Sequence, residues 1–294
     1  MNKGAIYAVS AYTLWGFFPI YFKALHLVPA LQIVGQRVVW SFVFLMVILA
    51  LRKEFPMFRS QIKARKTLLI YIGAAVLLAI NWLTYIWGVN NGYVLEASLG
   101  YFINPLVSVL LGVIFLGERP RAGQWLAVSV AAGGVVYLTL AYGRLPWIAL
   151  VLALTFGLYG FVKKTAPLGS LYGLSLETTV MVAPAFIFLF SQEISGVGAF
   201  GHLGLGMDVL MILGGALTAI PLLLFSAGAR LVPLTLVGIL QYISPTIQFL
   251  LGVFLFGEDF TPARLVGFSL IWAALVIFTG ENFLVRRKPA EATG

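Results

Sequence analysis

The sequence predicts an all-α polytopic membrane protein in which ten transmembrane helices form two five-helix repeats of inverted topology. Three observations predict it: an apolar composition, apolar runs of spanning length along the chain, and an internal similarity at one fixed offset. Of the 294 residues, 61% are hydrophobic and 10% are charged, and the mean hydropathy is +1.00. Because soluble domains carry about 25% charged residues, this chain has too few charges to cover a globular surface in water.

The apolar runs are long enough to cross a bilayer. A helix needs about 20 residues to cross roughly 30 Å of hydrocarbon. The run at the N-terminus reaches this length, so we interpret it as the first span rather than as a signal peptide. The ten expected spans lie near residues 5–25, 31–51, 68–88, 95–116, 122–142, 146–163, 171–191, 207–228, 234–256 and 263–283.

The basic residues lie in short loops beside these runs. With the N-terminus inside the cell, most of the 19 Lys and Arg residues fall on the inner side, at positions 3, 52, 53, 59, 63, 65, 66, 119, 121, 163, 164, 230, 286, 287 and 288. The positive-inside rule therefore predicts that both termini are cytoplasmic. The net charge of +9 is thus explained by the lipid bilayer, and we expect no nucleic-acid partner. The absence of cysteine excludes disulfides and thiolate chemistry.

The chain resembles itself when it is shifted by 140 residues. EASLGYFINPLVSVLLGVIFLGE (96–118) then meets LVGILQYISPTIQFLLGVFLFGE (236–258), with the proline, the LLGV block and the Gly-Glu pair in register. The shift spans five helices, an odd number, so the second half enters the membrane from the opposite side. Inverted repeats of this kind are typical of secondary transporters. We expect repeats at 1–142 and 143–294.

Each repeat carries a proline inside an apolar span. Pro105 and Pro245 cannot donate to the carbonyls of Tyr101 and Gln241, so both are expected to kink their helices. A freed carbonyl is tolerated where it lines a wet cavity or is buried in protein. We expect a solute-binding cavity lined by Trp15, Trp82, Tyr101, Asn104, Gln241, Tyr242, Ser244 and Gln248. The alternative is that the polar members only satisfy the kinked backbone and join helices.

Four charged residues lie within or beside the spans, where a charge is costly and usually paired or functional. Arg37 and Glu177 are 140 residues apart and so occupy matching positions. We hypothesise two gating ion pairs, Arg37–Glu96 at the outer mouth and Glu177–Arg230 at the inner mouth, which form alternately. One alternative is that both pairs are static and fix helix register. Another is that Glu96 or Glu177 carries a coupling proton.

Other residues are assigned local roles. Glu118 and Glu258 follow a glycine at the ends of their spans, and we interpret both as structural groups at the membrane interface. Pro19 is expected to free the carbonyl of Trp15, which supports Trp15 as a wall residue of the cavity.

Several segments together resemble a known family. They are WLTYIWGVNNGYVLEASLGYFINPLVSVLLGVIFLGER (82–119), AYTLWGFFPIYFK near the start, QRVVWS in the second span and QYISPT in the ninth. Over essentially the whole chain the sequence is similar to RarD-type permeases of the EamA branch of the drug/metabolite transporter superfamily. The resemblance implies a ten-helix permease of the bacterial inner membrane, built from two EamA repeats, in a family whose name is linked to chloramphenicol sensitivity.

The predicted function is secondary transport of a small organic solute, a metabolite or a drug-like amphipathic molecule, by alternating access. No Gly-Lys-Ser/Thr phosphate loop is present, so the chain itself is not expected to hydrolyse ATP. One alternative, an intramembrane lipid-modifying enzyme, needs a cluster of His, Asp or Ser or a metal-binding group of carboxylates. The other, a receptor or assembly subunit, needs larger loops. We therefore expect no enzyme activity, metal or cofactor, while substrate, direction, coupling and oligomeric state stay open.

Overall fold

The computed structural model describes residues 2–91, 93–143, 145–257 and 262–287. In these ranges the chain is all-helical, without a strand. The helices are α1 (Lys3–Gly16), α2 (Phe18–Ala24), α3 (Ala30–Leu51), α4 (Phe55–Gln61), α5 (Arg65–Asn90), α6 (Val94–Leu116), α7 (Ala122–Tyr142), α8 (Trp147–Thr165), α9 (Ser170–Ile194), α10 (Leu205–Leu231), α11 (Leu234–Gln241), α12 (Ile243–Phe254) and α13 (Pro262–Arg287).

The number of spans agrees with the prediction. Among the described residues, nine spans are long and apolar enough to cross a membrane, with α1–α2 and α11–α12 each counted as one. A further apolar stretch, Leu265–Glu281, lies within α13. The prediction of a polytopic all-α membrane protein is confirmed. The short helix α4 in the loop between the second and third spans was not predicted.

The first span is divided beside a proline. α1 ends at Gly16, and Pro19 lies in the first turn of α2. Because Pro19 has no N–H to donate, the carbonyl of Trp15 has no partner at the usual position. The side chain of Gln248 donates to that carbonyl at 3.2 Å, so a polar group from a distant span replaces the missing bond.

The two prolines of the internal similarity behave differently. The span that contains Pro245 is divided: α11 ends at Gln241, the residue whose carbonyl the proline leaves free, and α12 starts two residues later. α6 instead continues without a break through Pro105. A Cβ on Gly238 of α11 would lie 2.7 Å from the carbonyl oxygen of Pro105, so the two spans cross with their backbones almost in contact at this point.

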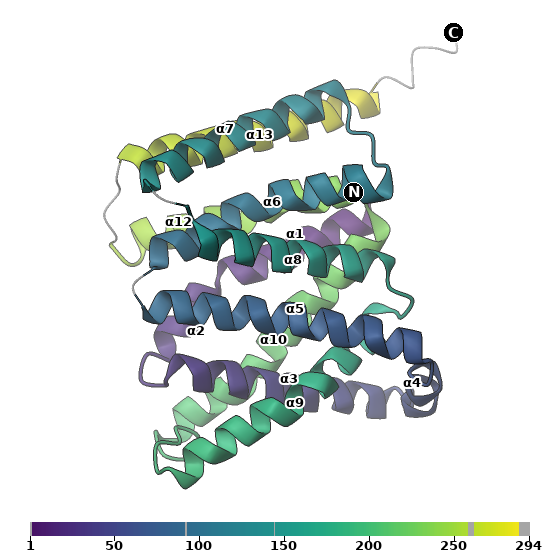
Figure 1. Cartoon of the computed structure of the whole chain (residues 1–294), viewed down its shortest axis with the longest axis vertical. Helices are drawn as coiled ribbons and strands as arrows, with labels where there is room; N and C mark the ends of the chain where they lie inside the picture. The colour runs from purple at the N-terminus through teal and green to yellow at the C-terminus, as the bar shows by residue number, and fades with distance from the viewer. Residues whose placement is uncertain (1, 92, 144, 258–261, 288–294) are drawn as a thin grey trace.

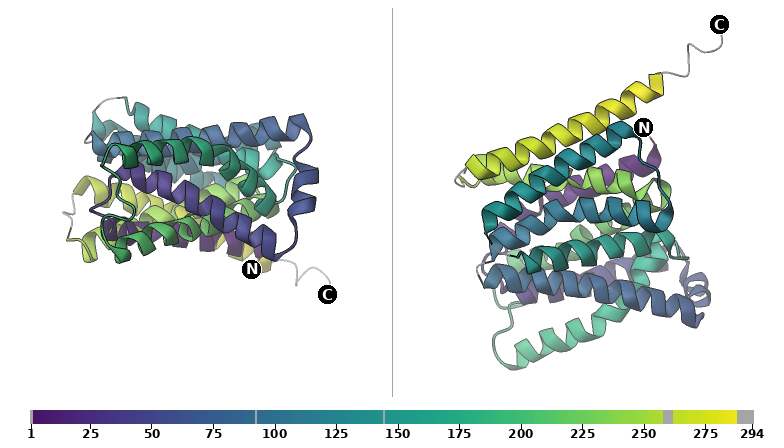
Figure 2. Two further views of the ribbon diagram at one scale, coloured as in Figure 1. Left: turned by 90° about the horizontal axis from the view of Figure 1, so that it is seen from below. Right: turned by 45° about the horizontal axis from the view of Figure 1, so that its top comes forward.

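The helices lie roughly alongside one another, as Figures 1 and 2 show, with α7 and α13 paired at one margin of the bundle. Most of the larger contacts among described residues have a counterpart when each span is exchanged with the span five places later, although the contact of α8 with α10 has no comparable counterpart between α1 and α5. α6 packs against α8 as α12 packs against α1, and α1 packs against α10 as α8 packs against α5. The contacts of α3 with α9, α6 with α11 and α7 with α13 map onto themselves. Equivalent faces therefore join the first five spans to the last five.

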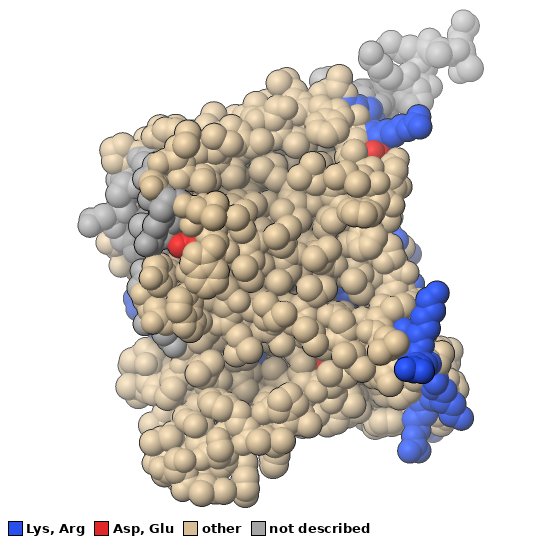
Figure 3. All heavy atoms as spheres, in the orientation of Figure 1, with Lys and Arg blue, Asp and Glu red and all other residues tan. Residues whose placement is uncertain are grey.

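Basic residues gather at one end of the bundle, named here the basic end. It is the end at which α1 begins and α4 lies, and Figure 3 shows Lys and Arg side chains collected there. α3 and α6 begin at the opposite end. The exposed basic side chains around α4 are those of Arg52, Lys53, Arg59, Lys63, Arg65 and Lys66.

Candidate functional site

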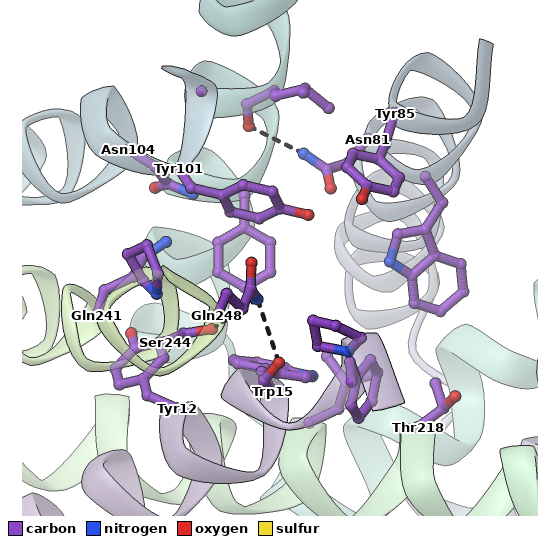
Figure 4. Close-up of a pocket in the computed structure, with 18 of the residues that line it drawn as sticks. Tyr12, Trp15, Asn81, Tyr85, Tyr101, Asn104, Thr218, Gln241, Ser244 and Gln248 are labelled. Carbon is purple, nitrogen blue, oxygen red and sulfur yellow. Dashed lines mark hydrogen bonds between the residues drawn. The ribbon is translucent and has the colours of Figure 1, made fainter. Parts of the chain in front are cut away.

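A cavity of about 140 Å³ lies among seven spans of the bundle, drawn from both halves of the chain (Figure 4). Tyr12 and Trp15 come from the last turns of α1, which begins at the basic end. Tyr101 and Asn104 come from the first half of α6, which begins at the opposite end. Thr218 lies near the middle of α10. The cavity therefore occupies the half of the bundle away from the basic end and reaches its middle.

Seven of the eight residues expected at the cavity line it, namely Trp15, Trp82, Tyr101, Asn104, Gln241, Ser244 and Gln248. Their role in binding a solute stays a proposal. The expectation is wrong for Tyr242, which is fully buried and does not line the cavity. Its hydroxyl donates to the carbonyl of Phe102 at 3.1 Å. Tyr242 is the residue at which α11 gives way to α12, and its ring packs in the core shared with α6, α7 and α13.

Four polar wall residues were missed by the sequence reasoning: Tyr12, Asn81, Tyr85 and Thr218. Asn81 donates to the carbonyl of Leu152 and to the hydroxyl of Thr155, both at 2.9 Å, so it joins α5 to α8. Asn81 precedes Trp82 inside an apolar span, where a polar residue already indicates a buried contact. Tyr12 lies three residues before Trp15, a spacing that places the two on one helix face.

Aromatic rings form much of the remaining wall. Trp15 lies edge-on to Phe156 at a centroid distance of 5.7 Å, and Tyr85 lies edge-on to Tyr101 at 5.9 Å. Ring pairs at such distances and angles are favourable. The cavity thus has a mostly apolar surface with a few polar groups, as small-molecule sites commonly do.

Arg37 contributes the only Lys or Arg side chain among the described residues that line the cavity. The side chain is 7% exposed, and its Nε donates to the hydroxyl of Thr218 at 2.8 Å. Three rings face the guanidinium at 5.1 to 5.5 Å, those of Phe18, Phe22 and Trp82. The backbone of α10 comes close to α3 here, because a Cβ on Gly215 would overlap the backbone of Trp40.

The expected pair Arg37–Glu96 is not formed, and this part of the gating hypothesis is wrong for the present structure. Glu96 Oε1 accepts the backbone N–H of Ile148 at 2.7 Å, in the first turn of α8. The first N–H groups of a helix lack partners within the helix and attract carboxylates. Glu96 therefore binds a helix end, while Arg37 binds a hydroxyl.

The expected pair Glu177–Arg230 is also absent. Glu177 forms a buried ion pair with Lys163, with Nζ and Oε1 2.7 Å apart and the side chains 0% and 2% exposed. The hydroxyl of Tyr159 donates to the other carboxylate oxygen at 2.9 Å. Arg230 instead donates to the carbonyls of Ala166 and Leu168 at 2.7 and 2.8 Å, just beyond the end of α8. These carbonyls lack helical partners, which explains why a cation near this terminus binds them.

Further polar contacts close the basic end around α8, α10 and α11. Lys164 donates to the carbonyls of Ala229 and Val232 at 3.1 and 2.6 Å. Glu118 accepts the backbone N–H groups of Leu234 and Thr235 at 2.5 and 2.8 Å, so it caps the start of α11. This contact agrees with the structural role expected for Glu118, whereas Glu258 lies outside the described residues.

An aromatic layer separates the cavity from these contacts. Tyr159 and Phe225 are almost fully buried and stack with an interplanar angle of 11°. Phe156, which lines the cavity, packs against both rings at 5.9 and 5.3 Å. The ion pair of Lys163 with Glu177 lies on the basic-end side of this layer. Within the part of the chain that the structure describes, no group of three His, Cys, Asp or Glu side chains is placed to bind a metal.

Comparisons with known proteins agree with this architecture. The EamA-like transporter family matches residues 2–140. An uncharacterized transporter of Bacillus subtilis (strain 168), YojE, is 46% identical over 282 residues, covering 95% of this chain and 94% of its own. Protein RarD of Escherichia coli (strain K12) is 40% identical over 290 residues, covering 99% and 98%.

A more distant relative and a solved structure extend the likeness. The chloramphenicol-sensitive protein RarD of Pseudomonas aeruginosa (strain PAO1) is 30% identical over 295 residues, covering 98% of this chain and 97% of its own. One solved crystal structure matches with a TM-score of 0.70 at 16% identity, covering 97% of this chain and 98% of its own, and it bears on the fold alone. With a cavity built from both halves of an apolar helical bundle and these relatives along nearly its whole length, the chain belongs to the EamA-like transporter family as a RarD-type membrane transporter.

Proposed function

We propose that the protein is a secondary transporter that moves a small organic solute through the membrane by alternating access. One observation supports this most: a cavity built from both halves of the chain lies in one half of the bundle, and an aromatic layer with buried polar contacts closes the other half. A solute in the cavity thus has a blocked path to the basic end. Transport requires that this end open while the opposite end closes.

The exchange of contacts between spans supports two repeats, 1–142 and 143–294. Most of the larger contacts between helices have a counterpart five spans later, which supports a transport cycle in which the two repeats exchange their arrangements and the cavity opens to the other side. In that motion Arg230 separates from the carbonyls of Ala166 and Leu168 at the basic end.

The distribution of charge supports a cytoplasmic basic end. The exposed Lys and Arg side chains around α4 belong on the inner side of a bacterial inner membrane, and the N-terminus lies at the same end. The cavity then faces the outside in the present structure. The walls support a solute with an apolar body rather than an inorganic ion, since rings and aliphatic groups form most of them. The names of the relatives support transport rather than enzyme activity.

Reconstitution into liposomes tests this function. Vesicles with purified protein are loaded with small-molecule extract from bacteria, and mass spectrometry compares the released solutes with those from empty vesicles. Chloramphenicol is included because it appears in the name of one relative. We expect release of at least one solute, and no release with Ser244→Trp, which fills the cavity.

Ser60→Trp is the matched control, because Ser60 is an exposed residue of α4. Equal release by the protein with Ser244→Trp and by the unchanged protein would contradict passage through this cavity. No release of any solute would contradict transport itself.

A further inference from the structure

The cavity contains a cation without a carboxylate partner. Arg37 uses its Nε for Thr218, but neither terminal nitrogen donates a hydrogen bond to any described residue. No Asp or Glu is among the described residues that line the cavity. A buried cation is normally paired, because desolvating an unpaired charge is costly. The three surrounding rings and one hydroxyl offset part of this cost, and they leave the hydrogen-bonding fork of the guanidinium open.

The buried ion pair of Lys163 with Glu177 lies on the basic-end side of the cavity. It shows how this protein compensates a buried charge that has only a structural role. Lys163 is matched by Glu177 at 2.7 Å and lies against the rings of Tyr71 and Tyr159. Arg37 has comparable ring contacts but lacks the carboxylate. The open side of the guanidinium matches a planar anion that accepts two N–H groups, a geometry that a carboxylate fits.

Two more polar atoms in the cavity wall have no partner. The side-chain oxygen of Asn104 and the hydroxyl of Tyr12 are buried, and neither has a hydrogen bond in the structure. The residues are 3% and 1% exposed, so ordinary solvent contact does not satisfy these atoms. Unsatisfied buried polar atoms are uncommon in folded proteins and often mark a site for an absent partner. They indicate a ligand with a hydrogen-bonding group in addition to its anion.

The size of the cavity fits a single ring of about the size of benzene. Its volume is about 140 Å³, and a cavity of about 150 Å³ in another protein holds benzene. Trp15 and Phe156 offer ring faces and edges to such a body.

We propose that the transported solute is an organic carboxylate with an aromatic or similarly apolar body, whose carboxylate is bound by Arg37 and whose further polar group meets Asn104 and Tyr12. The assignment rests on the proposed transport function and specifies the chemical class of its substrate. Arg37 thereby acts as a binding residue of the cavity rather than as one half of a fixed ion pair.

A matched set of ligands tests the charge preference on the unchanged protein. The purified protein is placed in phosphatidylcholine nanodiscs, so that no anionic lipid competes for Arg37. Binding of benzoate, benzamide and benzylamine is measured by calorimetry. We expect the carboxylate to bind roughly tenfold to a hundredfold more tightly than the amide, and the amine to bind most weakly, because a charge-assisted hydrogen bond contributes on this scale.

Variants then test whether Arg37 is responsible for the tighter binding of the carboxylate. Arg37→Gln removes the cation and should bind the carboxylate and the amide equally, whereas Arg37→Lys should retain part of the preference. Lys23→Gln is the control, because Lys23 is an exposed cation of α2 that does not line the cavity. It should leave the preference unchanged. The comparison of ligands on the unchanged protein does not depend on whether any variant folds.

The outcomes separate this assignment from the proposed function. Equal binding of carboxylate and amide, tighter binding of the amine, or no binding by any of the three would overturn the assignment to carboxylates. Flux of neutral or cationic solutes in the liposome assay would still support transport in those cases. A carboxylate preference that survives Arg37→Gln would overturn the role of Arg37.

Discussion

Arg37 and Glu177 lie 140 residues apart, at matching positions of the two halves, yet their surroundings differ. Glu177 is fully enclosed and paired with Lys163 near the basic end. Arg37 lines the cavity and has a hydroxyl and three rings around it. The residue that matches Lys163 is Lys23, so the first half places two cations where the second half places a cation and an anion. The same repeat position therefore holds a paired, buried carboxylate in the second half. In the first half it holds a cation in the cavity wall that has no carboxylate partner among the described residues.

The largest expected effect on stability comes from breaking the ion pair of Glu177 with Lys163. Lys163→Met leaves Glu177 buried without its cation, which should destabilise the protein by about 3–5 kcal/mol. Denaturation in detergent, followed by circular dichroism, measures the change in unfolding free energy. The double variant Lys163→Met/Glu177→Leu should recover most of the loss, since no unpaired charge then stays buried. Equal losses for the single and double variants would contradict the importance of the pair.

A second prediction concerns the helix cap at the basic end. Glu118→Ala removes the acceptor for two N–H groups at the start of α11 and should cost about 1–2 kcal/mol of unfolding free energy. Glu54→Ala is a matched control, because Glu54 pairs with an exposed Arg52 at the same end. A surface pair of this kind contributes about 0–1 kcal/mol. A larger loss for Glu54→Ala than for Glu118→Ala would contradict the capping role.

A third prediction concerns Arg37, the cation in the wall of the cavity. Arg37→Gln removes one hydrogen bond to Thr218 but also removes a buried cation that has no carboxylate partner in the described part of the chain, so the two effects offset each other and the unfolding free energy should change by less than about 1 kcal/mol. Transport in liposomes should nevertheless fall strongly. A loss of stability as large as that of Lys163→Met would show that Arg37 is a structural ion-pair residue whose partner lies elsewhere.

The smallest expected change in stability is that of Asn104→Leu. The side-chain oxygen of Asn104 is buried without a partner, so its removal sacrifices no bond from that atom and should change the unfolding free energy by less than about 1 kcal/mol. Binding of a ligand with a hydroxyl or amino group should weaken. Unchanged ligand binding, measured by calorimetry, would remove Asn104 from the site.

The number of spans and most of the cavity were predictable from the sequence. Apolar runs and prolines are local signals, and the free carbonyl of Trp15 beside Pro19 was expected from the chemistry of proline alone. Seven of the eight expected wall residues line the cavity. The physical reason is that polar groups beside helix breaks are tolerated in a bilayer mainly where they are buried in protein or line a wet cavity.

The charge pairs could not be predicted in the same way. Helix ends carry free N–H and carbonyl groups that compete with charged side chains for partners, and their positions depend on how distant helices meet. Glu96 accepts the N–H of Ile148 at the start of α8, and Arg230 donates to the carbonyl of Ala166 just beyond its end. Tyr242 was misplaced because the break between α11 and α12 sets the direction of its ring, and the sequence does not specify the geometry of that turn.

In the proposed mechanism the cavity opens alternately to the two sides of the membrane, and the absence of cysteine makes this directly measurable. Ser244→Cys places one thiol in the cavity, and Ser226→Cys places one in the closed half. A membrane-impermeant maleimide is applied from either side of oriented vesicles, with and without transported solute.

We predict that Cys at 244 is labelled from the side opposite the basic end, and that solute changes the labelling rates from the two sides in opposite directions. Cys at 226 should react only from the basic-end side and only when that half opens. Labelling of Cys at 244 from one side alone, at a rate that no transported solute changes, would contradict alternating access.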